Sequence, residues 1–361
     1  MDYLNKTESI GRIQELSNAM GVAGFEDKVV ELLRGYSEDL GEIKEDTLRN
    51  LFIYRSGNTG DRKVVQLDAH SDEVGFMVHS IRANGTLQIV PLGSWVNYNI
   101  PAHKVWVRNA DNEYIPGIIT SKPPHYMSEQ EKNAPVDIKQ MSIDVGATSK
   151  EEAIKEFKIR IGEPVVPYVD FEYDEKHDIM MGKAFDNRVG CAGVIDTLRA
   201  LQEETLAVDV VAGIATQEEV GARGSTVTTR VIKPDIAIVF EGCPADDTSA
   251  DSYEIQTAIK KGPMLRHMDA KMITNPRFQR FALDTAAKLN LPVQEAVRAG
   301  GSTNGSVIHL THQGIPTIVI GVPVRYAHTH YGISTYYDYE NSVKLAVELL
   351  KLLNEDVIQS F

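Results

Sequence analysis

Cysteine is scarce in this sequence. The chain has 361 residues and only two cysteines, Cys191 and Cys243, so neither a disulfide framework nor a zinc site built from thiolates is expected. No apolar run approaches the roughly 18 residues of a membrane span. The N-terminal segment also lacks the apolar core and the small-residue cleavage site of a secretory signal. We therefore expect a protein of the reducing cytoplasm, with no membrane partner.

Positive charge is in deficit. Lys and Arg total 37 against 51 Asp and Glu, which gives a formal net charge of −14. Proteins that bind nucleic acid usually present a basic patch or stripe, and anionic membranes attract polybasic segments. Neither partner is expected here. The 42% of apolar residues suffices for a sizeable core, and the length favours two domains.

Helical and strand patterns alternate over both ends of the chain, as in an α/β fold. The expected helices are 7–20, 26–36, 187–204, 275–289 and 341–353, and the expected strands are 50–56, 64–67, 208–215, 236–240 and 317–322. Between residues 73 and 169 the pattern changes to short β-rich segments separated by turn signals. One helix is expected there, over 149–156, opened by the capping-box pair Ser149 and Glu152. This stretch predicts a small barrel-like domain inserted into a larger α/β domain.

Acidic and imidazole side chains gather where strands end. Such residues stand at the ends of the expected strands or on the loops beside them, namely His70, Asp72, Asp186, Glu218, Glu219, Glu241 and His328. A parallel sheet brings successive strand ends to one edge, so residues far apart in sequence can converge there. Two imidazoles and several carboxylates suit a pair of divalent cations, with zinc, cobalt or manganese as candidates.

Each of these residues also has a purely structural explanation when taken alone. Asp186 fits a helix N-cap, the pair Glu218 and Glu219 fits a solvated turn, and His328 fits a loop histidine. His70 is harder to explain in that way, because it ends a strand that should be buried. Asp72, two residues on, is placed to orient its ring. The joint pattern therefore favours a metal site.

Five ordered segments carry a family resemblance. The run Leu67–Phe76 resembles the first metal motif of the M42 family of dinuclear metallo-aminopeptidases, which includes glutamyl aminopeptidases and the tetrahedral TET peptidases. Four further segments are similar to the family and follow in the same order, namely Gly182–Arg188, Thr216–Gly221, Phe240–Gly242 and Val324–Thr329. The segment Gly21–Glu26 and the insert are similar as well, so the resemblance covers nearly the whole chain.

The resemblance implies a fold and an assembly. It implies a zinc-peptidase-like, phosphorylase/hydrolase-like three-layer catalytic domain formed by residues 1–72 and 170–361. Residues 73–169 would form an inserted β-rich dimerisation domain, PDZ-like or a barrel. The family assembles into homo-oligomers built from dimers, commonly a tetrahedral dodecamer. Peptides would be the substrates.

The resemblance also implies a role for each site residue. Two divalent ions per subunit would bind, with His70 and Glu241 on one, Glu219 and His328 on the other, and Asp186 bridging both. Glu218 would be the general base that takes a proton from the bridging water. Asp72 would be a carboxylate that orients a metal ligand without binding the metal itself. Physical chemistry agrees, because adjacent Glu218 and Glu219 on an extended segment point in different directions. One can then bind metal while the other faces the substrate.

Several positions depart from the family pattern or carry no assigned role. Glu241 stands where many members have Asp, Thr303 stands where many have Asp in a glycine-rich run, and Thr329 replaces a frequent Ser. None of these changes removes an oxygen or nitrogen ligand. His125 could reach the active site of a neighbouring subunit. His330 could be a further site residue, although its position fits a loop histidine better.

Other functions stay open beside the aminopeptidase. A related amidohydrolase could use the same centre on N-acyl amino acids or dipeptides. A glycosidase working through two carboxylates would leave both histidines unexplained, and an inactive peptide-binding module would not need Glu218. A preference for acidic substrates would require a basic pocket, for which Arg298, Lys260 and Lys261 are the candidates.

Overall fold

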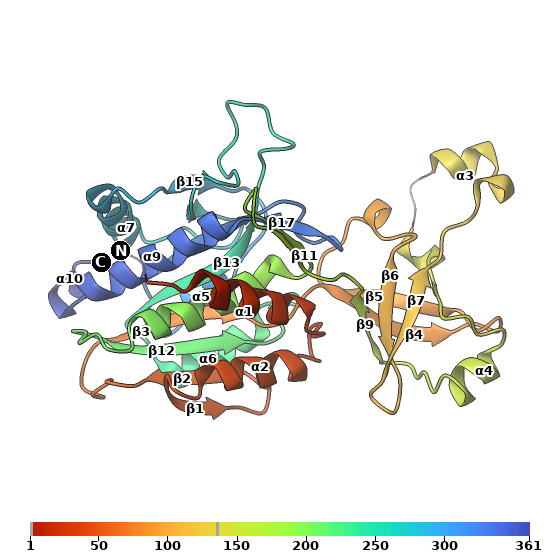
Figure 1. Cartoon of the computed structure of the whole chain (residues 1–361), viewed down its shortest axis with the longest axis horizontal. Helices are drawn as coiled ribbons and strands as arrows, with labels where there is room; N and C mark the ends of the chain where they lie inside the picture. The colour runs from red at the N-terminus through yellow and green to blue at the C-terminus, as the bar shows by residue number, and fades with distance from the viewer. Residues whose placement is uncertain (1–2, 135–136) are drawn as a thin grey trace.

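The computed structural model describes residues 3–134 and 137–361. It has two lobes, an α/β lobe that contains both chain ends and a smaller β-barrel lobe (Figure 1). The chain crosses from the α/β lobe into the barrel after β3 and returns from it after β9. No helix among the described residues is long and apolar enough to span a membrane.

An eight-stranded mixed sheet forms the centre of the α/β lobe, in the order β1-β2-β12-β3-β13-β16-β14-β15. The four middle strands β12, β3, β13 and β16 run parallel to one another, so their carboxyl ends share one edge. β2 pairs antiparallel with β12, and β14 pairs antiparallel with β16. The strand bounds are β1 Gly41–Glu45, β2 Leu51–Arg55, β3 Val64–His70, β12 Asp209–Ala215, β13 Ile236–Pro244, β14 Met264–Met268, β15 Gln294–Val297 and β16 Thr317–Val324.

Helices cover both faces of this sheet. The larger set packs on one face and contains α1 Lys6–Asn18, α2 Asp27–Ser37, α5 Phe185–Ala200, α7 Pro276–Leu289, α9 Tyr336–Leu352 and α10 Glu355–Gln359. The other face carries α6 Arg223–Ile232 and α8 Gly305–Ile308. Successive side chains of a strand point to opposite faces of the sheet, and this alternation separates the two cores. In β13, Ile238 and Phe240 face the larger set of helices, whereas Val239 faces α8. The predicted three-layer α/β fold is confirmed.

The barrel lobe is a closed six-stranded barrel in the order β4-β5-β8-β7-β6-β9. Its core is separate from that of the sheet and includes Phe76, Ile143 and Val165. The barrel closes through short pairings of β8, with β5 at Leu87 and with β7 at Ile118 and Ile119. Its strands are β4 Gly75–Ile81, β5 Leu87–Leu92, β6 Lys104–Arg108, β7 Tyr114–Ile119, β8 Ile143–Asp144 and β9 Pro164–Pro167, and its helical segments are η1 Asn97–Asn99, η2 Pro124–Tyr126, α3 Glu129–Asn133, η3 Ile138–Gln140 and α4 Lys150–Lys155.

A small antiparallel sheet ties two loops together beside the shared edge. It contains β10 Glu172–Asp174, β11 Ile179–Gly182 and β17 Gly332–Ser334, in the order β10-β11-β17. β11 leads directly to Asp186, and β17 follows the loop that carries His328. Pairing of Gly182 with Gly332 therefore fixes these two site segments against each other.

Helix ends follow local capping chemistry. The last long helix begins at Tyr336, five residues before the expected 341–353, because the Thr335 side chain accepts a hydrogen bond from Asp338 N. Ser149 caps α4 as expected, by accepting from Glu152 N at 3.2 Å. The Glu152 carboxylate bonds Thr148 N instead of Ser149 N, so only half of the predicted capping box forms.

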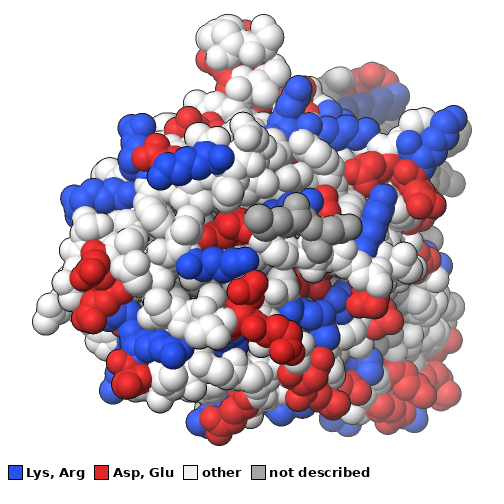
Figure 2. Space-filling view, turned by 60° about the vertical axis from the view of Figure 1, so that its left-hand side comes forward, with Lys and Arg blue, Asp and Glu red and all other residues white. Residues whose placement is uncertain are grey.

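Charges of both signs are interspersed on the surface. On the face in Figure 2, basic and acidic side chains alternate, and no continuous basic stripe crosses the described part of that face. Electrostatic binding of a polyanion would need such a stripe.

Candidate metal centre

A cavity of about 830 Å³ opens at the carboxyl edge of the four parallel strands. Six of the seven predicted site residues line it, namely His70, Asp186, Glu218, Glu219, Glu241 and His328. The seventh, Asp72, is fully buried. Residues that lie up to 258 positions apart in sequence, from His70 to His328, thus meet in one place.

The central strands position several of the candidate metal-binding side chains. His70 is the last residue of β3 and pairs in register with Ala215 at the end of β12, after which the turn to Glu218 begins. Glu241 lies inside β13. A Cβ on the next residue, Gly242, would stand 2.8 Å from Asp186 Cα. Glycine at this position therefore lets β13 approach the start of α5 closely.

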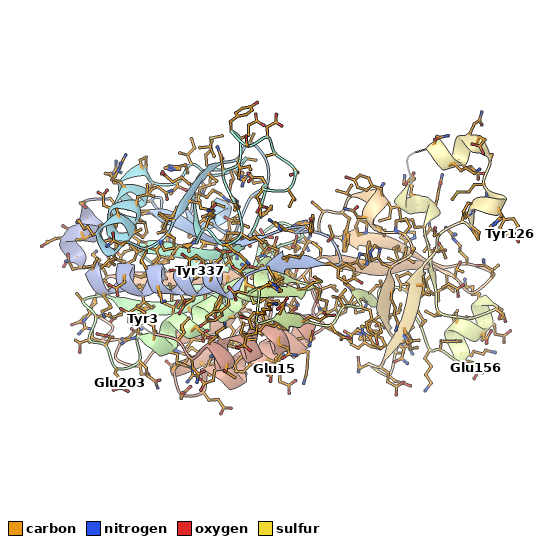
Figure 3. The ribbon with its side chains drawn as sticks, turned by 45° about the horizontal axis from the view of Figure 1, so that its top comes forward. Tyr3, Glu15, Tyr126, Glu156, Glu203 and Tyr337 are labelled. Atoms are coloured by element: carbon orange, nitrogen blue, oxygen red, sulfur yellow. The ribbon has the colours of Figure 1, made fainter. Side chains whose placement is uncertain are left out.

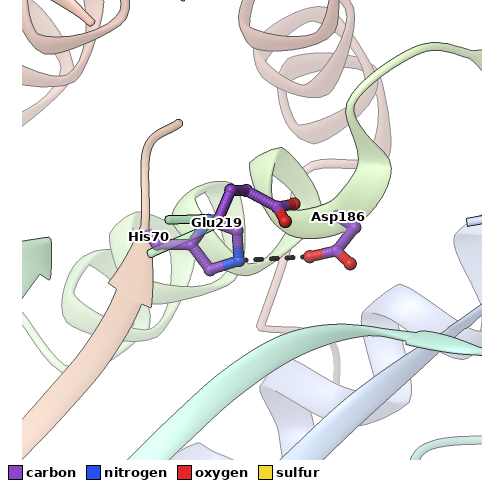
Figure 4. A group of neighbouring side chains, drawn as sticks. All are labelled: His70, Asp186 and Glu219. Atoms are coloured by element: carbon purple, nitrogen blue, oxygen red, sulfur yellow. Dashed lines mark hydrogen bonds and ion pairs between the residues drawn. The ribbon is translucent and has the colours of Figure 1, made fainter. Parts of the chain in front are cut away.

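Asp186 divides the centre into two halves. Its Oδ1 lies 3.1 Å from His70 Nε2, whereas its Oδ2 lies 3.3 Å from His328 Nε2. His70 Nε2 is also 3.3 Å from Glu241 Oε1, and His328 Nε2 is 3.5 Å from Glu219 Oε2. We call His70 with Glu241 the first half and Glu219 with His328 the second half. Figure 4 shows the Asp186 carboxylate facing the ring of His70, with Glu219 beside them.

The donors fit divalent cations. Ligand atoms of His70, Asp186 and Glu219 all lie within 4.8 Å of one another. Oε1 of Glu219 and Oε2 of Glu241 are buried and have no hydrogen-bond partner among the described residues. Burying unpaired carboxylates is costly, and a bound cation compensates for that cost. Imidazole and carboxylate together suit zinc, cobalt or manganese.

Crowded negative charge shifts the pKa values of the centre. Burial, with repulsion from neighbouring carboxylates, raises the pKa of Glu218 to about 8 and that of Glu241 to about 7. Burial also raises the pKa of Glu219. Burial alone would lower the pKa of His328, but the hydrogen bond to Asp186 and the charge of Glu219 raise it to about 10. Without cations, the centre therefore holds protons at neutral pH.

Cation binding should release protons. Groups with raised pKa values are mostly protonated at pH 6, and metal ligands must be deprotonated, so affinity should rise between pH 6 and pH 8. We expect a net release of protons when the ions bind. Calorimetric titration of chelator-treated protein with Zn²⁺, in buffers of different ionisation enthalpy, measures that release. A pH-independent affinity with no proton release would contradict the proposed ligand set.

Two buried carboxylates hold the turn after β12. Asp72 Oδ1 accepts from Glu218 N at 2.8 Å, and its Oδ2 accepts from Glu219 N at 3.0 Å. Its Oδ1 also lies 3.4 Å from His70 Nδ1. The preceding amide, Gln217 N, donates to Glu26 Oε1 at 3.0 Å. Because the buried carboxylates of Glu26 and Asp72 accept hydrogen bonds from three consecutive amides, the turn is fixed. Both Glu218 and Glu219 can then direct their side chains into the cavity.

Sequence reasoning assigned no role to Glu26. It lies in the segment Gly21–Glu26, which resembles the family. That resemblance is the feature of the sequence that could have pointed to Glu26. Its side chain is buried, and burial together with the charge of Asp72 raises its pKa to about 7. Arg266 and Lys271 line the cavity as well and were not anticipated.

The remaining candidates lie in different places. Thr303 is buried and its Oγ1 accepts from Gly305 N at 3.2 Å. Arg298 lines the cavity and pairs with Asp246 at 2.7 Å. Lys260 Nζ donates to His177 O, and neither Lys260 nor Lys261 is among the described residues that line the cavity. His125 precedes Tyr126, which Figure 3 places at the outer end of the barrel lobe, so its proposed reach into a neighbouring subunit stays a prediction.

Known proteins resemble this chain over nearly its full length. The model of the M42 glutamyl aminopeptidase family matches residues 49–345. The glutamyl aminopeptidase of Lactococcus lactis subsp. cremoris is 29% identical over 352 residues, which cover 97% of this chain and 98% of that protein. The lysyl aminopeptidase of Pyrococcus furiosus is 29% identical over 348 residues, which cover 94% of this chain and 96% of that protein.

A solved structure gives the same result. The TET aminopeptidase from the marine sediment archaeon Thaumarchaeota archaeon SCGC AB-539-E09 superposes with a TM-score of 0.94 at 34% identity, and the match covers 99% of each chain. These similarities confirm the predicted family and the predicted metal-dependent exopeptidase activity. The chain belongs to the M42 glutamyl aminopeptidase family of peptidases.

Proposed function

We propose that this protein removes N-terminal residues from short peptides with the help of two divalent ions per subunit. The observation that carries the proposal is Asp186, whose two carboxylate oxygens face two separate imidazole–carboxylate halves. His70 and Glu241 would hold one ion, Glu219 and His328 the other, and Asp186 would bridge them. Zinc, cobalt or manganese suits this donor set. A pair of such ions polarises the peptide carbonyl and activates water at neutral pH.

We propose that Glu218 acts as the general base. Its Oε2 lies 4.0 Å from His70 Nε2, which is farther than the corresponding contacts of Asp186 and Glu241. Glu218 lines the cavity and Asp72 holds its backbone amide, so its carboxylate is presented to the substrate. It can accept a proton from the attacking water at Oε2 and pass it to the leaving amine nitrogen.

The two arginines in the cavity do not select one substrate class by themselves. Arg266 lies 3.2 Å from Asp269 and Arg298 lies 2.7 Å from Asp246, so each already has an acidic partner. The similar proteins are named for opposite preferences, glutamyl in one case and lysyl in the other. A substrate panel therefore needs acidic, basic and apolar N-terminal residues.

The domain roles and the assembly are also proposals. Residues 1–72 and 170–361 would form the catalytic domain, and residues 73–169 the dimerisation domain. The closed barrel with its own core supports this division. We propose a homo-oligomer built from dimers, with a tetrahedral dodecamer as its full form, which sizing by light scattering tests. A cytoplasmic location is supported by two cysteines that are both free and buried.

Free-amine substrates test the proposed function most simply. We expect chelator-treated protein to release p-nitroaniline from aminoacyl-p-nitroanilides only after Co²⁺ or Zn²⁺ is restored. N-acetylated versions of the same substrates should not react, because an aminopeptidase binds the free amine. Hydrolysis of the acetyl group instead would favour the alternative, a deacylase. No release from any member of the panel would refute the proposal.

A further inference from the structure

We propose that the turn Gly93–Trp95 of the barrel lobe is a positioning element for the second half of the metal centre. The inference rests on the proposed function, since it concerns one of the two proposed ion sites. This turn follows β5 and is part of the barrel, yet Ser94 lines the cavity beside the metal ligands. The barrel would then complete the catalytic site of its own chain.

The backbone of Ser94 orients His328. His328 Nδ1 lies 2.8 Å from Ser94 O. A carbonyl oxygen only accepts, so Nδ1 must carry the hydrogen in this contact. If the ring is neutral, its unprotonated nitrogen is therefore Nε2, which faces Asp186 and Glu219, as a metal ligand requires.

The two halves differ in what orients their imidazoles. His70 Nδ1 lies 3.2 Å from Asp72 O, so groups of the α/β lobe hold the first half. A carbonyl of the barrel lobe holds the second half. His328 also has a left-handed backbone, with φ of 61°, and its side chain is one-third exposed. It therefore depends more than His70 on a neighbour that fixes its ring.

The same turn also packs against Glu219. Gly93 has φ of +83°, and a Cβ added there would stand 3.1 Å from Glu219 Oε2 and 2.6 Å from Val74 Cγ1. The turn thus contacts both residues of the second half, through the backbone at Ser94 and through close approach at Gly93. Glycine is required here for its conformation and for the space.

A stack of rings holds the turn across the junction of the lobes. Trp95 stacks on Phe76 of the barrel at 4.8 Å, and its Nε1 donates to Gly75 O at 3.1 Å. It also contacts the ring of His330 at 5.1 Å. His330 is buried and stacks on His103 of the barrel at 3.9 Å. Because His330 lies two residues after His328, this stack fixes the turn and the ligand loop together.

Metal binding to two variants tests the proposal. Gly93→Ala should push the turn away from Glu219, and His103→Ala should remove the ring that supports His330. We expect each variant to bind one of its two Co²⁺ ions at least about tenfold more weakly. A loss of this size is typical when a group that orients a metal ligand is removed. Equilibrium dialysis of chelator-treated protein against Co²⁺ measures the affinities. Anomalous density at limiting Co²⁺ should show the loss next to His328, with the ion beside His70 retained.

Matched controls separate this effect from general damage to the barrel. Gly162→Ala changes a barrel glycine with φ of +85°, where an added Cβ would have no described atom within 4 Å apart from its chain neighbours. Trp106→Leu breaks a different ring stack, with Tyr168 at 4.2 Å. Both controls should bind two ions as the wild type does. Equal weakening of both ions in the test variants, or no weakening, would overturn the proposal. A wild-type protein that binds fewer than two ions would instead refute the proposed function.

Discussion

Glu218→Gln is expected to lower kcat by about 10²–10⁴-fold while both ions stay bound. The substitution keeps the size and shape of the side chain but removes the group that accepts a proton from the attacking water. The ligands of both halves are unchanged, and the amide of residue 218 still donates to Asp72. KM should change little. Kinetics with a free-amine p-nitroanilide, together with metal analysis of the same sample, measures both quantities.

Glu203→Gln provides the matched control for this prediction. Glu203 is exposed, and Figure 3 shows it toward the end of the α/β lobe that is remote from the barrel. The control should keep the kcat of the wild type. If Glu218→Gln kept full activity, Glu218 would not be the general base. If it lost its ions, the loss of activity would have another cause and the division of roles between Glu218 and Glu219 would be wrong.

Asp186→Ala is expected to abolish the binding of both ions and to lower activity by about 10³-fold or more, because several kcal/mol of charge stabilisation are lost. Its two oxygens face the two halves separately, so one substitution removes a ligand from each. Glu241→Ala is the informative comparison. Glu241 lies 3.3 Å from His70 of the first half, so that variant should keep the ion of the second half. Elemental analysis after dialysis counts the ions.

The thermal stability of Asp186→Ala gives a second test of its loss of metal binding. Ions that bind only the folded chain stabilise it by about 2.7 kcal/mol at a concentration of 100 Kd. A chelator should therefore lower the Tm of the wild type by a few degrees, at about 1–2 °C per kcal/mol for a chain of this length, and should leave that of Asp186→Ala unchanged. Equal metal content in the wild type and Asp186→Ala would contradict the bridging role of Asp186.

The sequence could predict the site because its donors are tied to strong strand patterns. His70 ends a buried strand, and Glu241 lies in another. Parallel pairing of the four middle strands then brings the donors together, as the strand-end rule expects. The weaker elements escaped prediction. α6 is rich in Val and Thr, which have low helix propensity, and it is helical through packing on β12.

Long-range supports of the site could not be predicted. Glu26 holds an amide 191 positions away in the sequence, and no local pattern encodes that contact. Ser94 acts through its backbone carbonyl, so its side chain carries no signature of the contact with His328. The antiparallel pairing of β14 beside β16 likewise depends on tertiary structure. Residue types thus predicted which side chains meet in the cavity, whereas the groups that orient them required the fold.

A crystal structure of the protein soaked with Co²⁺, with anomalous data at the cobalt edge, tests the central claim most directly. We expect two peaks roughly 3.5–4 Å apart. One peak should lie between His70, Glu241 and Asp186 Oδ1, and the other between His328, Glu219 and Asp186 Oδ2. A single peak, or two peaks that do not share Asp186, would contradict it.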